Sequence, residues 1–255
     1  MKKKIGLIGF GVIGSHIFRR IEEEGLMKVG FIFEVDRKKT ESLHPSLLLT
    51  SFDDFEKRPV DLVVEAANAQ AVTELGLQIL KKSDFLIFSL TALADEDFRQ
   101  KMETTARNSG KRIYIPHGAI LGLDGIQDGR KVIEEVRVTT TKNPKNLGLE
   151  VGTTQPVVVY EGATREACER FPRNVNVHAS IALAGLGFDK THSKIIADPG
   201  TNKMTQVVEV VGKGLRWKIE TESTPVGAVT GAYTPESAYQ TVRRICVEET
   251  GLQLA

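Results

Sequence analysis

Three glycines near the start of the chain constrain its fold more than any other feature. Gly9, Gly11 and Gly14 give the pattern G-x-G-x-x-G. The pattern lies between a short apolar run and a helical pattern that begins at Val12. The first glycine permits a tight turn, the second lets backbone approach a pyrophosphate, and the third allows close helix packing. The pyrophosphate is expected at the helix N-terminus, against the free N–H groups of residues such as Val12 and Ile13.

An acidic residue follows the second apolar run, residues 29–35. Asp36 comes about 20 residues beyond the glycines, where a carboxylate accepts hydrogen bonds from the ribose hydroxyls of NAD. The same carboxylate would repel the 2′-phosphate of NADP. The basic residues Arg37 to Lys39 follow at once, and they could bind that phosphate or form a solvated turn. NAD is therefore favoured as the cofactor, and NADP stays open.

The alternation of apolar and helical segments continues through the first half of the chain. Apolar runs at residues 60–66, 85–90 and 112–115 alternate with helical patterns at residues 69–82 and 95–108. Continuous apolar strands separated by helices are typical of a parallel sheet that is covered on both faces. The sequence therefore predicts an α/β fold, a Rossmann-type doubly wound sheet whose ligands bind at the carboxyl edge of the strands.

After about residue 120 the pattern changes. The strand-like runs are residues 131–141, 193–197, 205–211 and 215–221, and the helical runs are residues 164–170, 177–186 and 235–249. Short turns between consecutive strands predict an open, mainly antiparallel sheet. We expect a dinucleotide-binding domain at residues 1–120, completed by the C-terminal helix at 235–250. A second α+β domain at residues 121–234 would serve substrate binding and dimerisation.

Composition excludes several classes of protein. Thirty-four basic and thirty-three acidic residues give a net charge of +1, which argues against a nucleic-acid partner. Cys168 and Cys246 are too few for a disulfide framework and lack zinc-site spacing, so we expect core thiols and no metal. No apolar run reaches the roughly 18 residues that a membrane span needs. These features predict a cytoplasmic globular protein.

Longer motifs point to one family. They are SLTALAD at 89–95, HGAILGLDGI at 117–126, EGATREACERFPRNVNVHASIALAGLGFDKT at 161–191, and ADP at 197–199. With these motifs the sequence resembles the L-aspartate dehydrogenase family, whose members oxidise aspartate with a nicotinamide cofactor and feed pyridine-nucleotide synthesis. The FPRNVNV segment is the most specific. The resemblance implies a Rossmann domain and a second domain whose open sheet builds the substrate site and a dimer contact.

Two residues correspond individually to the family pattern. Ala119 matches the alanine whose backbone lies against the nicotinamide end of the cofactor. Asn176 matches the asparagine that contacts the cofactor, and its amide can both donate to and accept from a carboxamide. Helix capping before Val177 is the alternative role for the asparagines, and it is the more serious one for Asn174.

The sequence departs from the family at two places. The family has a catalytic histidine in the strand after the ADP motif, and Gln206 stands at its place, or Thr205 if the register shifts by one residue; neither register offers a histidine. An Asn-Pro-Lys-Thr segment before the last helix is also missing. His178 stands where the family usually has alanine, so it is a candidate for a displaced acid–base group. Its alternative role is a structural residue satisfied by a neighbouring carbonyl.

These observations support two functional hypotheses. The first is an NAD(P)-dependent oxidoreductase that acts on aspartate or a related small amino or oxo acid, with Arg173 or Lys190 as candidate cations for a dicarboxylate. The second is a nucleotide-binding relative that keeps the cofactor and has lost turnover. Asn176 favours the first hypothesis, whereas Gln206 favours the second. The strands between residues 193 and 221 would leave one apolar face open unless it is covered, which suggests a homodimer through the second domain.

Overall fold

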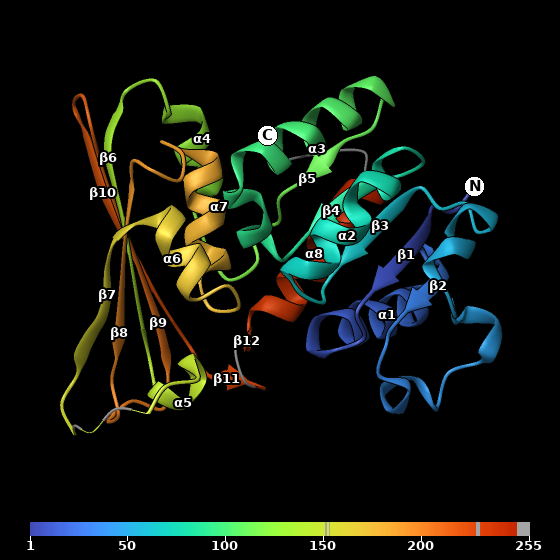
Figure 1. The fold of residues 1–255 in the computed structure, drawn as a ribbon, viewed down its shortest axis with the longest axis horizontal. Helices are drawn as coiled ribbons and strands as arrows, with labels where there is room; N and C mark the ends of the chain where they lie inside the picture. The colour runs from blue at the N-terminus through green and yellow to red at the C-terminus, as the bar shows by residue number, and fades with distance from the viewer. Residues whose placement is uncertain (151, 153, 228–229, 249–255) are drawn as a thin grey trace. The chain divides into compact units, whose positions relative to one another are not determined.

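The computed structural model describes residues 1–150, 152, 154–227 and 230–248, which belong to two compact units (Figure 1). Unit 1 comprises Met1–Ser89, Asp97–Pro116 and the segment from Pro235 onward, and unit 2 comprises Leu90–Glu96 and His117–Thr234. Residue 249, at the end of the last predicted helix, lies outside the described residues. Among the described residues, no helix is long and apolar enough to cross a membrane.

Unit 1 contains a five-stranded parallel sheet with the order β2-β1-β3-β4-β5. Its strands are β1 (Lys4–Ile8), β2 (Lys28–Phe33), β3 (Leu62–Glu65), β4 (Asp84–Ile87) and β5 (Ile113–Tyr114). The strand order reverses between β1 and β3, and in open α/β sheets the ligand binds in the crevice at such a point. The predicted parallel sheet is confirmed.

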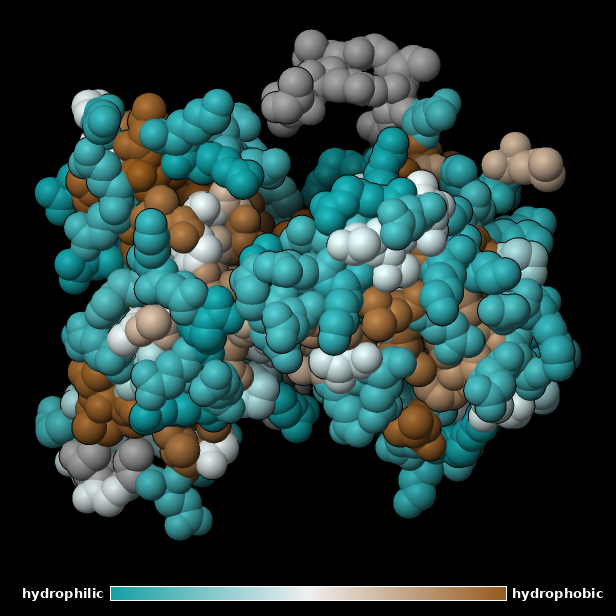
Figure 2. Space-filling view, turned by 45° about the horizontal axis from the view of Figure 1, so that its top comes forward, coloured by the Kyte–Doolittle hydropathy of each residue, from teal (hydrophilic) through white to brown (hydrophobic). Residues whose placement is uncertain are grey.

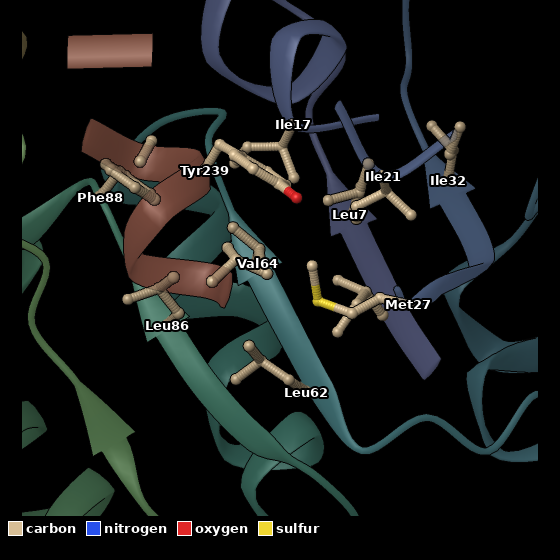
Figure 3. Close-up of a cluster of buried hydrophobic side chains, with 13 residues drawn as sticks. Leu7, Ile17, Ile21, Met27, Ile32, Leu62, Val64, Leu86, Phe88 and Tyr239 are labelled. Carbon is tan, nitrogen blue, oxygen red and sulfur yellow. The ribbon is translucent and has the colours of Figure 1, made fainter. Parts of the chain in front are cut away.

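Helices cover both faces of this sheet. Helices α1 (Val12–Glu24) and α8 (Thr234–Cys246) pack on one face, where Ile17 and Tyr239 join the cluster of buried side chains shown in Figure 3. Helices α2 (Ala69–Leu80) and α3 (Glu96–Asn108) pack on the other face, where Met102 lies against α2. Helix α1 ends at Gly25 in the left-handed conformation, with φ of 62°. The unit is therefore doubly wound, as predicted.

Short 3₁₀ segments replace longer helices in several connections. They are η1 (Arg37–Thr40), η2 (Pro45–Leu47), η3 (Phe52–Lys57) and η4 (Leu90–Ala94). The first three connect β2 to β3, and η4 carries most of the SLTALAD run.

Unit 2 contains a five-stranded sheet with the order β10-β9-β6-β8-β7. Its strands are β6 (Ile133–Lys142), β7 (Val157–Ala163), β8 (Thr191–Ala197), β9 (Met204–Gly212) and β10 (Leu215–Ser223). All neighbouring pairs are antiparallel except β6 and β8, so the sheet is mainly antiparallel as predicted. Sequence analysis missed β7. A small sheet pairs β11 (Pro225–Val226) with β12 (Thr230–Gly231).

The helices of unit 2 cover one face of its sheet. They are α4 (Leu123–Gly129), α6 (Thr164–Arg170) and α7 (Asn176–Ala184), and α5 (Pro144–Leu147) is a short turn after β6. Ile126 of α4 and Ile181 of α7 share a core cluster with Val138 of β6 and Val208 of β9. The apolar face of the sheet is therefore covered within the chain itself.

The structure corrects the expectation of an open apolar face. Alternate residues point away from the helices, and many of them are charged: Arg137, Lys194, Glu209, Lys218 and Glu220. Sequence analysis did not predict that the helices before and after these strands would cover the inner face of the sheet. On the face of the molecule drawn in Figure 2, hydrophilic residues predominate and hydrophobic ones form small groups.

Candidate functional site

The glycine loop joins β1 to α1 in unit 1, and its glycines differ in the space around them. Gly9 has φ of 88°, and a Cβ on it would lie 2.7 Å from the Ala66 carbonyl oxygen. A Cβ on Gly14 would lie 2.1 Å from the Gly9 carbonyl oxygen. No atom lies within 4 Å of a Cβ built on Gly11. Gly9 and Gly14 are therefore required by the fold, whereas Gly11 borders open space that a ligand can enter.

The first turn of α1 offers backbone donors to an anion. Gly11 is its N-cap residue, and no side chain caps the helix there. The first helical hydrogen bond runs from the Ser15 N–H to the Gly11 carbonyl, at 3.0 Å. The N–H groups of Val12 and Ile13 precede it, at the positive end of the helix dipole. These residues fit the pyrophosphate of a dinucleotide.

Asp36 lies beyond the end of β2, which stops at Phe33 rather than continuing to residue 35. Its carboxylate accepts a hydrogen bond from the Lys38 N–H at 3.2 Å and caps η1. The side chain is 48% exposed, so the carboxylate is open to a ligand. That exposure is compatible with the predicted contact to ribose hydroxyls, which stays a prediction.

Glu34 is a residue of this site that sequence analysis missed. Its carboxylate accepts hydrogen bonds from the N–H groups of Phe10, at 2.7 Å, and Asp36, at 2.9 Å. Burial acts to raise the pKa of Glu34, but these hydrogen bonds outweigh it and hold the pKa below its ordinary value. Glu34 thus fixes the glycine loop to the segment that carries Asp36. The sequence signal that could have identified Glu34 is an acidic residue within the apolar run at residues 29–35.

Asn176 connects two of the motifs in unit 2. Its Oδ1 accepts a hydrogen bond from the Thr91 N–H at 3.2 Å, and the Thr91 hydroxyl donates to the Pro172 carbonyl at 2.9 Å. Asn176 begins α7, whose N-cap residue is Val175, and no side chain caps that helix. The capping role considered for Asn174 and Asn176 is therefore wrong.

Ala119 lies in the turn that precedes α4. The Ile120 N–H donates to the His117 carbonyl at 3.0 Å, and Gly118 adopts a positive φ of 57°. Ala119 itself is half-buried. The fingerprint glycines and Asp36 belong to unit 1, whereas Ala119, Asn176, His178 and Gln206 belong to unit 2.

A line of buried hydrogen bonds crosses the sheet of unit 2 beneath α7. The Thr140 hydroxyl lies 2.6 Å from Gln206 Oε1 and 2.7 Å from His178 Nε2. His178 Nδ1 lies 2.8 Å from the Ser193 hydroxyl, which lies 2.7 Å from the Thr164 hydroxyl. Hydroxyl groups, rather than the neighbouring carbonyl considered above, satisfy the imidazole. Gln206 and His178 are therefore brought together through one threonine.

His178 is held as a neutral imidazole. Its side chain is fully buried, and burial, together with the charge of Lys142, lowers its pKa to about 3. Both ring nitrogens are within hydrogen-bond distance of hydroxyl groups. This environment favours an indirect role through Thr140 and Gln206 over direct proton exchange with a substrate.

Lys142 is a second residue that sequence analysis missed. It ends β6, is 3% exposed, and its Nζ lies 3.4 Å from Asn174 Oδ1 and 3.5 Å from the Asn174 carbonyl oxygen. Burial lowers its pKa to about 8. The cations suggested earlier, Arg173 and Lys190, are both exposed. Lys142 occupies a position where the β-strand pattern predicts an apolar residue, which was the signal available.

Two further histidines and both cysteines have structural environments. His16 lies 3.0 Å from Glu236, and His44 caps η2. Burial raises the pKa of the Cys168 thiol to about 12, and it does the same for Cys246. Across the described ranges, no group of three or more His, Cys, Asp or Glu side chains could hold a metal ion.

Comparison with known proteins identifies the family. Residues 124–245 match the family model "Aspartate dehydrogenase, C-terminal", and residues 9–116 match "Homoserine dehydrogenase, NAD binding domain". The L-aspartate dehydrogenase of Nitrosopumilus maritimus (strain SCM1) is 32% identical over 266 residues, which cover 97% of this chain and 98% of that protein. The chain belongs to the aspartate dehydrogenase family.

Other aspartate dehydrogenases agree with this assignment. The Thermotoga maritima L-aspartate dehydrogenase is 38% identical over 198 residues, which cover 76% of this chain and 80% of that protein. The crystal structure of aspartate dehydrogenase from Thermotoga maritima matches with a TM-score of 0.80 and 30% identity, over 100% of both chains. The resemblance described from the motifs is confirmed, and this member of the aspartate dehydrogenase family is an NAD(P)-dependent dehydrogenase.

The glycine loop of this aspartate dehydrogenase family member generates a first prediction. Gly11→Ala should keep the fold, losing at most about 1 kcal/mol through a poorer N-cap. Its methyl group would occupy the space that a pyrophosphate enters, so NAD affinity should fall at least about tenfold, or 1.4 kcal/mol. Calorimetric titration and thermal unfolding measure the two quantities. Gly14→Ala is the control, and it should lower the melting temperature. Ordinary NAD affinity in Gly11→Ala would show that no phosphate approaches residue 11.

A second prediction concerns cofactor preference. We expect NAD to bind more tightly than NADP, because the Asp36 carboxylate repels a 2′-phosphate. Asp36→Asn keeps an oxygen that can accept from Lys38 N–H but removes the charge, so the gap between the two dissociation constants should narrow. Asp53→Asn, in an exposed 3₁₀ turn, is the control and should change neither constant. A preference for NADP in the unmodified protein contradicts this assignment.

Proposed function

We propose that the protein catalyses the NAD(P)-dependent oxidative deamination of L-aspartate, or of a related small amino acid, to the imine or oxo acid. The similarity of both units to L-aspartate dehydrogenases carries the proposal. In the family such a product feeds pyridine-nucleotide synthesis, and we assign the same place to this protein. A nicotinamide dinucleotide would supply the hydride acceptor, and its phosphates would bind at Gly11 and the first turn of α1.

Asn176 supports this assignment through its proposed contact with the cofactor. The hydrogen bond from Thr91 occupies its Oδ1, which orients the amide and leaves the Nδ2 hydrogens available. An amide nitrogen held in this way can donate to the carbonyl of a nicotinamide carboxamide. The proposed contact therefore depends on a side chain whose orientation is already fixed by backbone.

The proton-transfer step is where this chain departs from its family. Oxidation of an amino acid requires hydride transfer, loss of a proton from the amine, and addition of water to the imine. A histidine can exchange that proton near neutral pH, whereas the Gln206 amide can orient a water or a substrate but cannot cycle a proton. His178 is the alternative base, although its burial and lowered pKa work against direct proton exchange with a substrate.

A second candidate function follows from that departure. The protein would be a relative that binds the dinucleotide and turns over little or no amino acid. The specific observation in its favour is the environment of Gln206, which is 7% exposed and bonded to Thr140. Initial rates with NAD or NADP, across aspartate, other amino acids, and oxaloacetate with ammonia, distinguish the two functions.

A third prediction tests the role of Gln206. The unmodified protein should bind the cofactor normally and oxidise aspartate slowly. Gln206→His should restore a proton acceptor and raise kcat, by up to the roughly 10²- to 10⁴-fold typical of general acid–base catalysis.

If His178 supplies the base instead, His178→Ala should abolish turnover and Gln206→His should change little. His192→Ala, on the opposite face of the sheet, is the control. If the unmodified protein oxidises aspartate rapidly and neither Gln206→His nor His178→Ala changes the rate, the base is a different residue.

A fourth prediction concerns assembly. We infer a homodimer through the outer face of the unit 2 sheet, where Ile196, Val207 and Val211 are half-buried among charged neighbours. Light scattering should report a dimer at micromolar concentration. Val207→Asp should yield a monomer, because it places a charge in the middle of this face. Val132→Asp is the control, since Val132 is 42% exposed in the turn before β6. A monomeric unmodified protein would contradict the inference.

A further inference from the structure

Lys142 is a buried cation without a matching anion in the described chain. Its side chain is 3% exposed, and no ion pair joins it to a carboxylate among the residues that the structure describes. Its contacts with Asn174, at 3.4 and 3.5 Å, are at the long limit for hydrogen bonds. Burying an ammonium group with so little compensation costs stability, so such a residue usually has a functional reason.

Several hydrogen-bond donors lie around the end of β6. Asn174, which contacts Lys142, is two residues before α7, and no side chain caps the positive end of that helix. Thr140 lies two residues before Lys142 on the same face of the strand, and it bonds Gln206. Burial lowers the pKa of His178, and the nearby charge of Lys142 lowers it further. These groups make a polar region with an excess of positive charge.

We propose that Lys142 binds a carboxylate of the substrate, beside Asn174 and the N-terminus of α7. This inference deepens the proposed function and rests on it, because it assigns an anionic acid as the ligand of unit 2. A carboxylate supplies the negative partner charge that Lys142 lacks in the described chain. It also accepts hydrogen bonds from the N-terminus of α7. Lys142 is a binding residue in this assignment, and proton transfer stays with the groups discussed above.

The alternative cations fit this role less well. Arg173 and Lys190 are exposed, so water screens their charge and weakens any contact with a carboxylate. An ammonium group in a buried site acts through a lower effective dielectric constant, and it discriminates more strongly against neutral ligands. A buried lysine therefore favours acids over uncharged amino-acid side chains.

Succinate, a dicarboxylate that cannot be oxidised at an amine, tests the proposal. Its dissociation constant is measured by calorimetry with NADH present. Lys142→Met should weaken succinate binding by roughly one to three orders of magnitude, because one partner of a buried charge pair is lost. NADH affinity should stay the same. The melting temperature of the unliganded protein should stay the same or rise, because a buried charge is removed.

Lys142→Gln is a second variant, since it keeps a donor that can reach Asn174 while losing the charge, and it too should lose succinate binding. Lys190→Met is the control for loss of a lysine in the same unit, and it should leave succinate binding unchanged. If both Lys142 variants lower the melting temperature as well as the affinity for succinate, the proposal is overturned. Lys142 would then be a structural residue that supports the Asn174 segment. Unchanged succinate binding in Lys142→Met, or no succinate binding by the unmodified protein, would also overturn it.

The outcome is separable from that of the proposed function. If the unmodified protein fails to oxidise aspartate but Lys142→Met still loses succinate binding, the carboxylate site stands and the reaction is wrong. If aspartate is oxidised and the KM of Lys142→Met is unchanged, the reaction stands and the carboxylate site is wrong.

Discussion

Backbone packs directly against backbone where β1 turns into α1, and the nucleotide site depends on this contact. Gly9 lies against Ala66 at the end of β3, and Gly14 lies against Gly9, so neither position has room for a Cβ atom. Two buried carboxylates then fix the loops around the turn. Glu34 accepts from Phe10 N–H, and Glu65 accepts from the N–H groups of Ala67 and Ser89. The first turn of α1 is thereby positioned before any ligand arrives, which reduces the ordering cost of binding.

Unit 2 uses a different principle, because its interior contains paired polar side chains rather than close backbone contacts. Thr140, His178, Ser193 and Thr164 are all buried, and each lies within hydrogen-bond distance of the next. Partnered in this way, such groups are tolerated in the interior and restrict the sheet and α7 to one arrangement. Gln206 lies at the end of this line of hydrogen bonds, and its bond to Thr140 fixes its position. The surrounding structure therefore holds the Gln206 side chain firmly, whatever its role in the reaction.

Sequence analysis predicted the parts of the molecule that local signals determine. The glycine spacing identified the nucleotide loop, and the apolar runs located the five strands of unit 1 and their parallel arrangement. It failed where burial depends on strand pairing. Glu34 and Lys142 were not singled out, yet both side chains are buried, Glu34 against the N–H groups of the glycine loop and Lys142 at the end of β6. The apolar face expected to be open is covered by α4 and α7, a packing that no local signal reveals.

The two units should therefore respond differently to substitution. In unit 1 the groups free to meet an anion are backbone N–H groups, so side-chain changes at Val12 or Ile13 should leave these donors in place, whereas a methyl group at Gly11 should block them. In unit 2 the polar side chains rest on buried partners, so a change at Thr140 should alter Gln206 and His178 together.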